Sequence, residues 1–368
     1  MNTRWHEVTN ADEIPSPALL IYAERVEENI RRMIALAGGT TRLRPHIKAH
    51  KMAEMMHLQL ALGLTQFKCA TLAEAEMAAL AGAEDVLLAY QPVGPNVPRL
   101  FELAARFPRV RFSCVADNAT SIGELSDAAA SAGTRLEVLL DLDVGQHRTG
   151  VAAERAFYLY RFLAAQPSLI PGGLHAYDGH IHDTDVAART AACEAAFEPV
   201  ELLRRELVRE SLPVPRVVAG GTPTFPMHAR RSDVECSPGT CVFWDAGYAR
   251  MFPDLDFRPA AVLLTRVVSK PAPNRLCLDL GHKAVASEMP HPRAVFLNLD
   301  DATPVMHSEE HLVIETPHAD AFAIGDVLYG VPWHICPTVA LHSEAVVVRE
   351  QRAEERWKVA ARNRALTV

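Results

Sequence analysis

Paired cysteines are absent from this sequence of 368 residues. Its seven cysteines are scattered, odd in number and free of any Cys-x-x-Cys motif, so we do not expect a disulfide framework. Long apolar runs are absent too, because none approaches the roughly 20 residues that a membrane-spanning helix needs. The N-terminal segment lacks the charged and then apolar pattern of a secretory signal. We therefore expect a cytoplasmic protein with no membrane association.

Basic residues are outnumbered by acidic ones, 37 to 45, which gives a formal net charge of -8. An acidic chain has no electrostatic attraction for nucleic acid or anionic lipid. The apolar fraction of 49% and the charged fraction of 22% are ordinary for a globular protein. The length predicts one large domain and a smaller one, with enough buried surface for a core.

Apolar runs and amphipathic segments alternate along the first two thirds of the chain. Residues 24–37, for example, place Val26, Ile30 and Met33 on one helical stripe. Alternation of this kind predicts parallel strands joined by crossover helices, and eight such units match a (β/α)8, TIM-like barrel; a doubly wound open sheet is the alternative. The predicted strands lie near residues 42–45, 66–70, 85–91, 110–117, 135–143, 171–178, 215–219 and 233–236.

The pattern changes after Tyr248, where no long helical stripe remains. Short apolar or alternating runs separated by turn residues predict a C-terminal antiparallel β domain. We place the barrel at residues 23–248 and the β domain at residues 249–368, and we expect the strand within residues 1–22 to join the second domain. The predicted β-domain strands lie near residues 260–268, 275–280, 293–299, 310–316, 323–331 and 344–349.

The densest group of basic residues is Arg44-Pro-His-Ile-Lys-Ala-His-Lys51, which closes the first predicted strand. Active sites in barrels of this kind lie at the C-terminal ends of the strands. A lysine at that position, flanked by His46 and His50, can be partly desolvated and lose its proton. An unprotonated Lys48 would be the nucleophile that forms a Schiff base. A basic loop facing solvent is the alternative interpretation.

Two further segments suit an anionic ligand. Ala219-Gly-Gly-Thr-Pro-Thr224 follows the seventh strand, where paired glycines let backbone amides approach a phosphate. Strand five ends in Asp141-Leu-Asp-Val-Gly-Gln-His-Arg148. Arg148 there could pair with a cofactor oxygen or close a structural salt bridge with Asp141 or Asp143.

Two histidine-containing segments suggest proton transfer or metal binding. Strand six ends in His175-Ala-Tyr-Asp-Gly-His-Ile-His182, and His180 and His182 lie just beyond it. A His-rich polar loop is the alternative. In Pro332–Thr338, His334 and Cys336 would point the same way if the segment is extended, and together they suit Zn²⁺. A buried cysteine beside a core histidine is the alternative there.

Taken together, these segments resemble the fold-type III pyridoxal 5′-phosphate enzymes of the D-threonine aldolase and D-serine dehydratase group. The resemblance rests on RPHIKAHK, DVGQHRTG, AYDGH, AGGTPT and the late HIC, which run in order from residue 44 to residue 338. It implies that Lys48 holds the cofactor as a Schiff base, and it implies a divalent metal (Zn, Mn or Mg) at His334 and Cys336. The implied cofactor-binding residues are Lys48, His46, Arg148, Tyr177, Gly220, Gly221 and Thr222.

The resemblance also implies a homodimer that acts on D-configured β-hydroxy-α-amino acids. The pair of His334 and Cys336 favours a dehydratase of D-serine or D-3-hydroxyaspartate, which releases ammonia and an oxo acid. His180 and His182, by contrast, lie where the aldolases place a catalytic histidine. We therefore predict a D-threonine aldolase-type lyase that gives glycine and an aldehyde. A racemase or a non-catalytic cofactor-binding protein is disfavoured by the late HIC and by the β domain.

Overall fold

The computed structural model describes residues 4–367. They form two compact units. The first consists of the residues up to Arg32, Ala49–Met52 and Thr240–Arg362, and the second of Met33–Lys48, Ala53–Gly239 and the residues from Asn363 onward. Each unit is described by itself. No helix within residues 4–367 combines the length and the apolar character that crossing a membrane requires.

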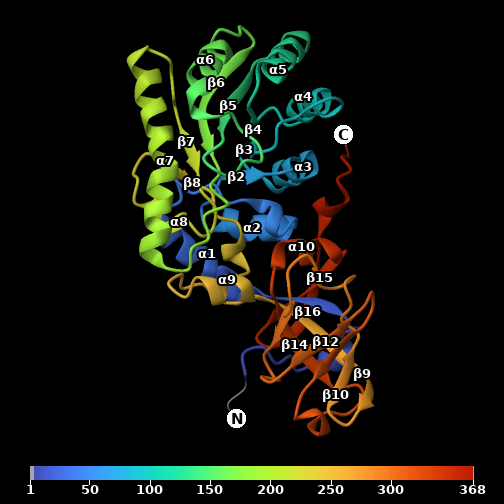
Figure 1. The fold of residues 1–368 in the computed structure, drawn as a ribbon. Coiled ribbons are helices and arrows are strands. Elements are labelled where there is room, and N and C mark those ends of the chain that lie inside the picture. Colours follow the sequence, from blue (N-terminus) through green and yellow to red (C-terminus); the bar gives the residue numbers. More distant parts are fainter. Residues whose placement is uncertain (1–3, 368) are drawn as a thin grey trace. The chain divides into compact units, whose positions relative to one another are not determined.

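A curled sheet of seven parallel strands forms the centre of the second unit (Figure 1). Neighbouring strands follow each other in chain order, as expected when every connection is a crossover. The strands are β2 (Gln66–Cys69), β3 (Asp85–Leu88), β4 (Arg111–Ala116), β5 (Leu136–Leu142), β6 (Leu169–Ala176), β7 (Val217–Ala219) and β8 (Glu235–Cys236). The predicted barrel-like fold is confirmed.

The predicted first strand, near residues 42–45, is not a strand. Two isolated parallel bridges replace it: Leu43 pairs with Cys236 on β8, and His46 pairs with Lys68 on β2. Pro45 explains the interruption, because it lies between the two bridges and has no N–H to donate to a ladder. The segment still links the two edges of the sheet, since Arg44 N donates to Cys236 O and Lys68 N donates to Pro45 O.

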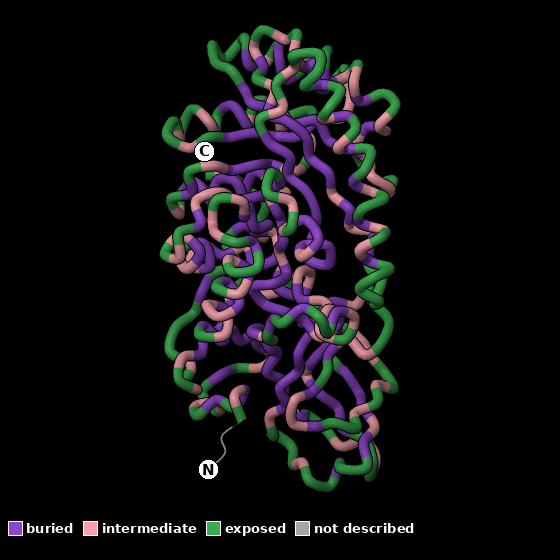
Figure 2. Tube along the Cα trace, turned by 90° about the vertical axis from the view of Figure 1, so that its left-hand side faces the viewer, coloured by how far each residue is buried: buried purple, intermediate pink, exposed green. Residues whose placement is uncertain are grey.

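Helices surround this sheet and expose their outer turns, whereas the strands are buried (Figures 1 and 2). Side-chain caps fix the beginnings of three of them: Thr71, Asn118 and Asp185 each accept a hydrogen bond from a first-turn amide. The helices are α2 (Ala53–Ala61), α3 (Leu72–Ala81), α4 (Asn96–Arg106), α5 (Ala119–Ser131), α6 (Ala153–Ala164), α7 (Val186–Arg209) and α8 (Phe225–Ala229). Helix α1 (Ala23–Ala37) begins in the first unit and ends in the second.

Buried ion pairs occupy the end of the sheet where the strands begin. The Arg44 side chain is fully buried, and its guanidinium lies 2.6 Å from Asp85 Oδ1 and 2.7 Å from Glu235 Oε2. Arg216 lies 3.1 Å from Asp85 Oδ2 and 2.7 Å from Glu137 Oε1. Asp85 and Glu235 are the first residues of their strands. The opposite end, where the strands finish, is therefore the one left for chemistry.

An extended sheet forms most of the first unit, in the order β12-β13-β10-β9-β1-β15-β16, with β14 and then β11 branching from β9. Every pairing is antiparallel except that of β1 with β15. The strands are β1 (Ala18–Tyr22), β9 (Ala261–Ala272), β10 (Arg275–Leu278), β11 (Ala294–Phe296), β12 (Thr303–His307), β13 (Leu312–Glu315), β14 (Val327–Pro332), β15 (Glu344–Arg349) and β16 (Arg352–Lys358).

The strand predicted within residues 1–22 is β1, and its pairings with β9 and β15 join it to the β domain. Two short helices, α9 (Ala246–Met251) and α10 (Ile335–Leu341), also belong to the first unit. Short 3-10 turns complete the described chain at Ala11–Glu13, Ile47–Ala49, Thr240–Val242, Ala319–Ala321 and Ala360–Asn363.

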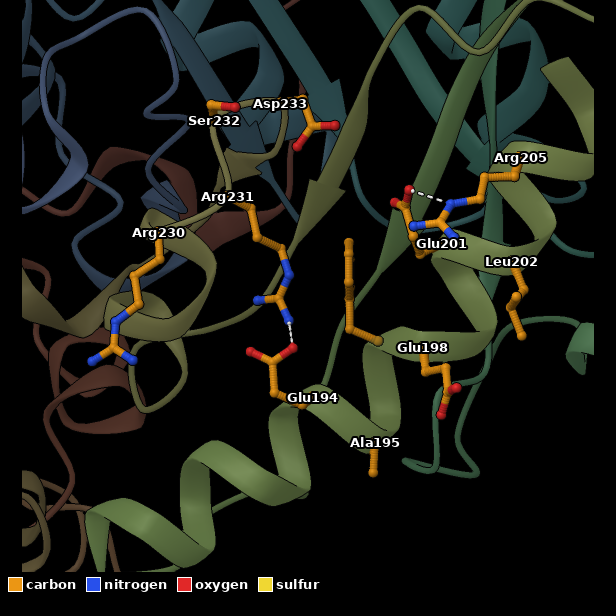
Figure 3. Close-up of a pocket in the computed structure, with 11 residues that line it drawn as sticks. Glu194, Ala195, Glu198, Glu201, Leu202, Arg205, Arg230, Arg231, Ser232 and Asp233 are labelled. Carbon is orange, nitrogen blue, oxygen red and sulfur yellow. Dashed lines mark hydrogen bonds and ion pairs between the residues drawn. The ribbon is translucent and has the colours of Figure 1, made fainter.

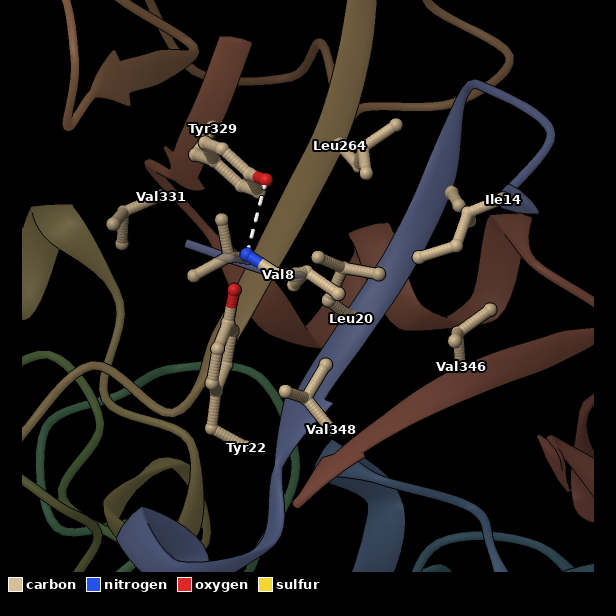
Figure 4. Close-up of a cluster of buried hydrophobic side chains, with 11 residues drawn as sticks. Val8, Ile14, Leu20, Tyr22, Leu264, Tyr329, Val331, Val346 and Val348 are labelled. Carbon is tan, nitrogen blue, oxygen red and sulfur yellow. Dashed lines mark hydrogen bonds between the residues drawn. The ribbon is translucent and has the colours of Figure 1, made fainter. Parts of the chain in front are cut away.

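One face of the sheet around β1 packs a core of branched and aromatic side chains (Figure 4). Leu20, Leu264 and Val348, from three different strands, are all buried in it. The hydroxyl of Tyr329 accepts a hydrogen bond from Val8 N at 3.2 Å, so its only polar atom is satisfied inside an apolar cluster. This core holds the N-terminal segment against the β domain.

Candidate active site

Lys48 lies in the 3-10 turn Ile47–Ala49, directly after the bridge at His46. His46 is buried, and its Nδ1 accepts a hydrogen bond from Lys48 N at 3.4 Å. The Lys48 ammonium lies 5.7 Å from the centre of the Tyr177 ring. Tyr177 immediately follows β6. Lys48 and Tyr177 are far apart in the chain but lie at the same end of the sheet.

Other cations surround the same ring. The Arg148 guanidinium carbon lies 5.1 Å from the centre of the Tyr177 ring, and the Lys68 ammonium lies 5.6 Å from it. Gly221 also approaches this ring, because a Cβ at that position would lie 3.1 Å from Tyr177 Cε2. Three positive side chains and a glycine backbone around one aromatic ring would suit a flat, anionic ligand.

Lys68 was not among the predicted site residues. It lies in β2 and is only 2% exposed. Burial, followed by the charge of Lys48, lowers its pKa to about 7, although Asp141 and Asp178 oppose the shift. The signal in the sequence was a lysine between the apolar residues Phe67 and Cys69, near the end of the strand Gln66–Cys69.

Asp141 and His175 form a buried pair at the ends of β5 and β6. His175 Nδ1 lies 2.6 Å from Asp141 Oδ1, and Thr149 Oγ1 donates to the other carboxylate oxygen at 3.0 Å. Burial lowers the pKa of His175, which keeps the ring neutral. Its Nε2 is enclosed and has no partner within residues 4–367. A neutral ring that donates through Nδ1 leaves Nε2 as a buried acceptor for a ligand group.

Arg148 makes no ion pair within the described residues, so the salt bridge with Asp141 or Asp143 that the sequence left open does not form. Asp143 is used locally instead: its carboxylate accepts hydrogen bonds from the amides of Gly145 and His147, and it lies 2.8 Å from His147 Nδ1. The compact turn that results explains the difference, because it occupies Asp143 and leaves Arg148 beside Tyr177.

The glycine turn at residues 220–222 is held tightly. Gly220 has φ +79°, and a Cβ there would lie 2.5 Å from the His228 ring, so only glycine fits without strain. Gly220 N donates to Ala176 O at 3.0 Å, and Gly221 N donates to Thr224 Oγ1 at 3.3 Å. Thr222 Oγ1 accepts from Gly239 N at 3.2 Å. Gly220 N is therefore bonded to the end of β6, and Gly221 N is bonded to the hydroxyl of Thr224.

His180 and His182 differ in their surroundings. His180 is half-buried against the loop after β5, since a Cβ on Gly145 would lie 2.8 Å from its Nε2. Its Nδ1 is enclosed and has no partner among the described residues. His182 is exposed to solvent. The structure thus places only His180 against a loop that follows a strand of the parallel sheet.

His334 and Cys336 lie in the first unit, and the segment that carries them is not extended, which was the condition for strand alternation to align their side chains. His334 is the N-cap residue of α10, and Cys336 lies in the first turn of that helix. The two side chains nevertheless lie close enough for Cys336 to raise the pKa of His334. His334 Nδ1 lies 2.6 Å from Glu288 Oε1, and Thr240 Oγ1 lies 3.5 Å from Cys336 Sγ. The helix start, rather than strand alternation, brings the pair together.

The surroundings of His334 resemble those of metal-binding histidines. Burial would lower its pKa, but the nearby Cys336 and the hydrogen bond to Glu288 raise it to about 9. A carboxylate on one ring nitrogen is the usual outer partner of a histidine that binds metal through the other. Asp245 fixes the helix start by accepting from Ile335 N at 3.0 Å. An imidazole and a thiol held in this way fit a divalent metal.

A cluster of three buried side chains was missed in the sequence. Asp178, Cys193 and His228 place a carboxylate oxygen, a sulfur and a ring nitrogen within 4.8 Å of one another. They come from the end of β6, from α7 and from α8. Asp178 is part of the AYDGH segment, but nothing in the sequence linked it to residues fifteen and fifty positions later.

A cavity of about 650 Å³ lies on the outer side of the second unit, along α7, and holds none of the predicted site residues (Figure 3). Four of its charged side chains form two pairs: Arg231 Nη2 lies 2.5 Å from Glu194 Oε2, and Arg205 Nε lies 3.2 Å from Glu201 Oε1. The residues that line this hollow include no histidine, cysteine or lysine.

Comparison with known proteins identifies the family. The family model "Alanine racemase, N-terminal domain" matches residues 21–246, and the model "Putative serine dehydratase domain" matches residues 260–348. A D-threonine aldolase of Arthrobacter sp is 34% identical over 95% of this chain and 93% of its own length. The chain belongs to the alanine racemase-like family that includes D-threonine aldolase.

Other members of this alanine racemase-like family share the architecture. A 3-hydroxy-D-aspartate aldolase of Paracoccus denitrificans is 31% identical over 96% of this chain and 93% of its own length. The crystal structure of D-threonine aldolase from Filomicrobium marinum superimposes with a TM-score of 0.90 at 29% identity, covering 99% of both chains. D-threo-3-hydroxyaspartate dehydratase from Delftia sp. HT23 shares the fold, with a TM-score of 0.80 at 23% identity over 95% of this chain and 98% of that one. The predicted family and the prediction of an enzyme of the aldolase and dehydratase group are confirmed.

Proposed function

We propose that this protein is a pyridoxal 5′-phosphate- and divalent-metal-dependent lyase that cleaves D-β-hydroxy-α-amino acids between Cα and Cβ, as a D-threonine aldolase does. The products are glycine and an aldehyde. The observation that carries the proposal is the meeting of Lys48, Arg148, Tyr177 and Gly221 at the end of the sheet where the strands finish. Extensive similarity to a D-threonine aldolase supports it.

The residues at this end of the sheet fit pyridoxal phosphate. The Lys48 amine would hold the cofactor's aldehyde, and the turn at Gly220, Gly221 and Thr222 would hold its phosphate. His46, Arg148 and Tyr177 would lie around the ring, and the buried, unpartnered Nε2 of His175 offers one more polar contact. When bound, the cofactor supplies an electron sink for the pair of electrons left at Cα.

A divalent metal fits His334 and Cys336, with Glu288 orienting the histidine. Nitrogen and sulfur ligands suit Zn²⁺ better than Mg²⁺. When bound, the metal supplies Lewis acidity toward the substrate hydroxyl. Two protein ligands leave positions for water and substrate, as in catalytic rather than structural sites.

The chain's own bases move the protons. A histidine takes the proton of the β-hydroxyl as the Cα–Cβ bond breaks, and Cα then gains a proton as glycine forms. We assign the histidine role to His180, because its ring is half-buried against the loop after β5 and its Nδ1 is enclosed without a partner among the described residues. His182 is exposed and is the alternative base.

Dehydration is the second candidate. In that reaction Lys48 would remove the Cα proton and the β-hydroxyl would leave as water, and hydrolysis of the resulting imino acid by another water would give an oxo acid and ammonia. Cys336 favours this route, and a D-threo-3-hydroxyaspartate dehydratase of Delftia sp. is 29% identical over 63% of this chain.

The deciding experiment is to incubate the purified protein, loaded with pyridoxal 5′-phosphate and Zn²⁺, Mn²⁺ or Mg²⁺, with D-threonine and separately with D-serine. We expect glycine and acetaldehyde from D-threonine, and no turnover in the presence of a chelator. Predominant formation of oxo acid and ammonia would establish the dehydratase instead. Conversion of the D-amino acid that a chelator leaves unchanged, with neither glycine nor oxo acid formed, would exclude both and would favour a racemase.

We further propose that the enzyme works as a homodimer in the cytoplasm on a small D-amino acid, without a nucleic-acid or membrane partner. Light scattering coupled to gel filtration measures the first point directly. A mass of about 40 kDa, that of a single chain, would exclude the dimer.

A further inference from the structure

A buried carboxylate lies directly behind the glycine turn. Asp178 is 3% exposed and follows Tyr177 by one residue. Its Oδ1 accepts a hydrogen bond from Thr224 Oγ1 at 2.8 Å, and its Oδ2 lies 2.8 Å from His228 Nε2. Thr224 is fully buried, and His228 is 1% exposed. None of these three residues belongs to the cofactor contacts described above.

Both partners of this carboxylate contact the turn. Thr224 Oγ1 accepts from Gly221 N at 3.3 Å. The His228 ring fills the space that a side chain on Gly220 would occupy, 2.5 Å from the position of a Cβ. Asp178 therefore connects the end of β6 to both glycines, one through a hydroxyl and the other through a ring.

The hydrogen-bond directions are determined by the carboxylate. Burial would raise the pKa of Asp178, but the hydrogen bonds from His228 and Thr224 bring it below its usual value, so the group is ionised and can only accept. The Thr224 hydroxyl must then donate its proton to Asp178, and this orientation directs a lone pair of Thr224 Oγ1 toward Gly221 N. Replacing the carboxylate would free that hydroxyl to rotate.

We propose that Asp178 is a positioning residue for the phosphate of the cofactor, acting on the Gly220–Gly221 turn through Thr224 and His228. This inference rests on the proposed use of pyridoxal phosphate and extends it to residues that do not contact the cofactor. Because Asp178 holds the turn in place before the phosphate binds, binding loses less conformational entropy.

The same atoms invite a metal interpretation, since Cys193 Sγ lies 3.5 Å from His228 Nε2. The buried Nδ1 of His228, which has no partner within the described chain, argues against it. A histidine that binds metal through Nε2 carries its proton on Nδ1 and needs an acceptor there. A proton on Nε2 that is donated to Asp178 leaves Nδ1 as a bare acceptor, which costs less to bury.

The test compares two ligands that differ only in the phosphate. Dissociation constants for pyridoxal 5′-phosphate and pyridoxal are measured by absorbance for the parent protein, Thr224→Val and Thr224→Ser. Valine keeps the shape of threonine but loses the hydroxyl, whereas serine keeps the hydroxyl. We expect Thr224→Val to bind pyridoxal 5′-phosphate about tenfold more weakly, to bind pyridoxal unchanged, and Thr224→Ser to match the parent.

Asp178→Asn and Cys193→Ser form the second pair. The amide introduced by Asp178→Asn has only one oxygen and cannot accept from both partners in the same way, so the preference for the phosphorylated ligand should again fall, whereas Cys193→Ser should keep it. The proposal would be overturned if Thr224→Val lost equal affinity for both ligands, or if neither Thr224→Val nor Asp178→Asn lost affinity for pyridoxal 5′-phosphate. It would also be overturned if the parent bound one equivalent of metal that Cys193→Ser did not bind. A parent protein that binds no pyridoxal 5′-phosphate would instead refute the proposed function.

Discussion

Replacing Lys68 with methionine should stabilise the protein, and by an amount that depends on pH. The side chain is fully buried in β2, and burial together with the charge of Lys48 lowers its pKa from 10.5 to about 7. The unfolded chain keeps the ordinary pKa. At pH 7 and below, the folded state therefore bears the cost of a buried ammonium, on the order of 4 kcal/mol at about 1.4 kcal/mol per pKa unit. Methionine has a similar length and removes that cost.

The pH dependence follows from linkage. Between pH 7 and pH 10.5 the unfolded chain binds a proton at this lysine that the folded chain has released, so the parent protein gains stability as pH rises. The advantage of Lys68→Met should be largest below pH 7, about half as large at pH 9, and absent above pH 10.5. Charge is the cause, so a surface lysine such as Lys283, paired with Glu309 and Glu310, provides the control.

The assay is urea and thermal unfolding of the cofactor-free parent, Lys68→Met and Lys283→Met at pH 7 and pH 9. We expect only Lys68→Met to raise the midpoints, and to raise them more at pH 7. A variant that is less stable than the parent at pH 7, or a gain that stays the same at pH 9, would refute the argument that Lys68 is buried at an electrostatic cost.

Three further changes have defined outcomes. Asp85→Asn should lower the free energy of unfolding by about 3 kcal/mol at pH 7, because it breaks ion pairs with Arg44 and Arg216. Those pairs hold the pKa of Asp85 down, so the difference in stability should fade as the pH falls below the ordinary carboxyl pKa. A difference that persists undiminished at low pH would contradict this reasoning. His180→Asn should reduce kcat by about a hundredfold or more while His182→Asn stays near the parent, and steady-state kinetics with the reverse order would move the base to His182. Cys336→Ala should retain bound pyridoxal 5′-phosphate but lose tight metal binding and turnover, as measured by metal analysis, and full activity would exclude the metal site.

Most of the parallel sheet could be predicted because its strands are short apolar runs between amphipathic helices. The exception near residues 42–45 has a local cause in Pro45, which interrupts the ladder and leaves two bridges. In the β domain, β12 and β16 were missed because their residues are mostly exposed. Edge strands of this kind carry no apolar alternation for a sequence pattern to detect.

The candidate site was predictable where motifs carry the chemistry, as at Lys48 and the glycine turn. It was not predictable where a property depends on burial. The pKa of Lys68, for example, depends on its burial and on neighbours from other parts of the chain. The helix at Ile335 was missed although Pro337 gave a signal, since proline is well tolerated in the first turn of a helix. Asp178 and His228 show the remaining limit, because a contact across fifty residues leaves no local pattern.

The central claim is that Lys48 is the lysine that holds the cofactor's aldehyde. Reducing the protein with borohydride after incubation with pyridoxal 5′-phosphate fixes the cofactor to whichever lysine holds it, and peptide mass mapping then locates it. The account predicts one modified peptide, containing Lys48, from a protein with several other lysines, including the nearby Lys68. Modification of Lys68 in its place, or scattered low-level modification of surface lysines, would contradict it.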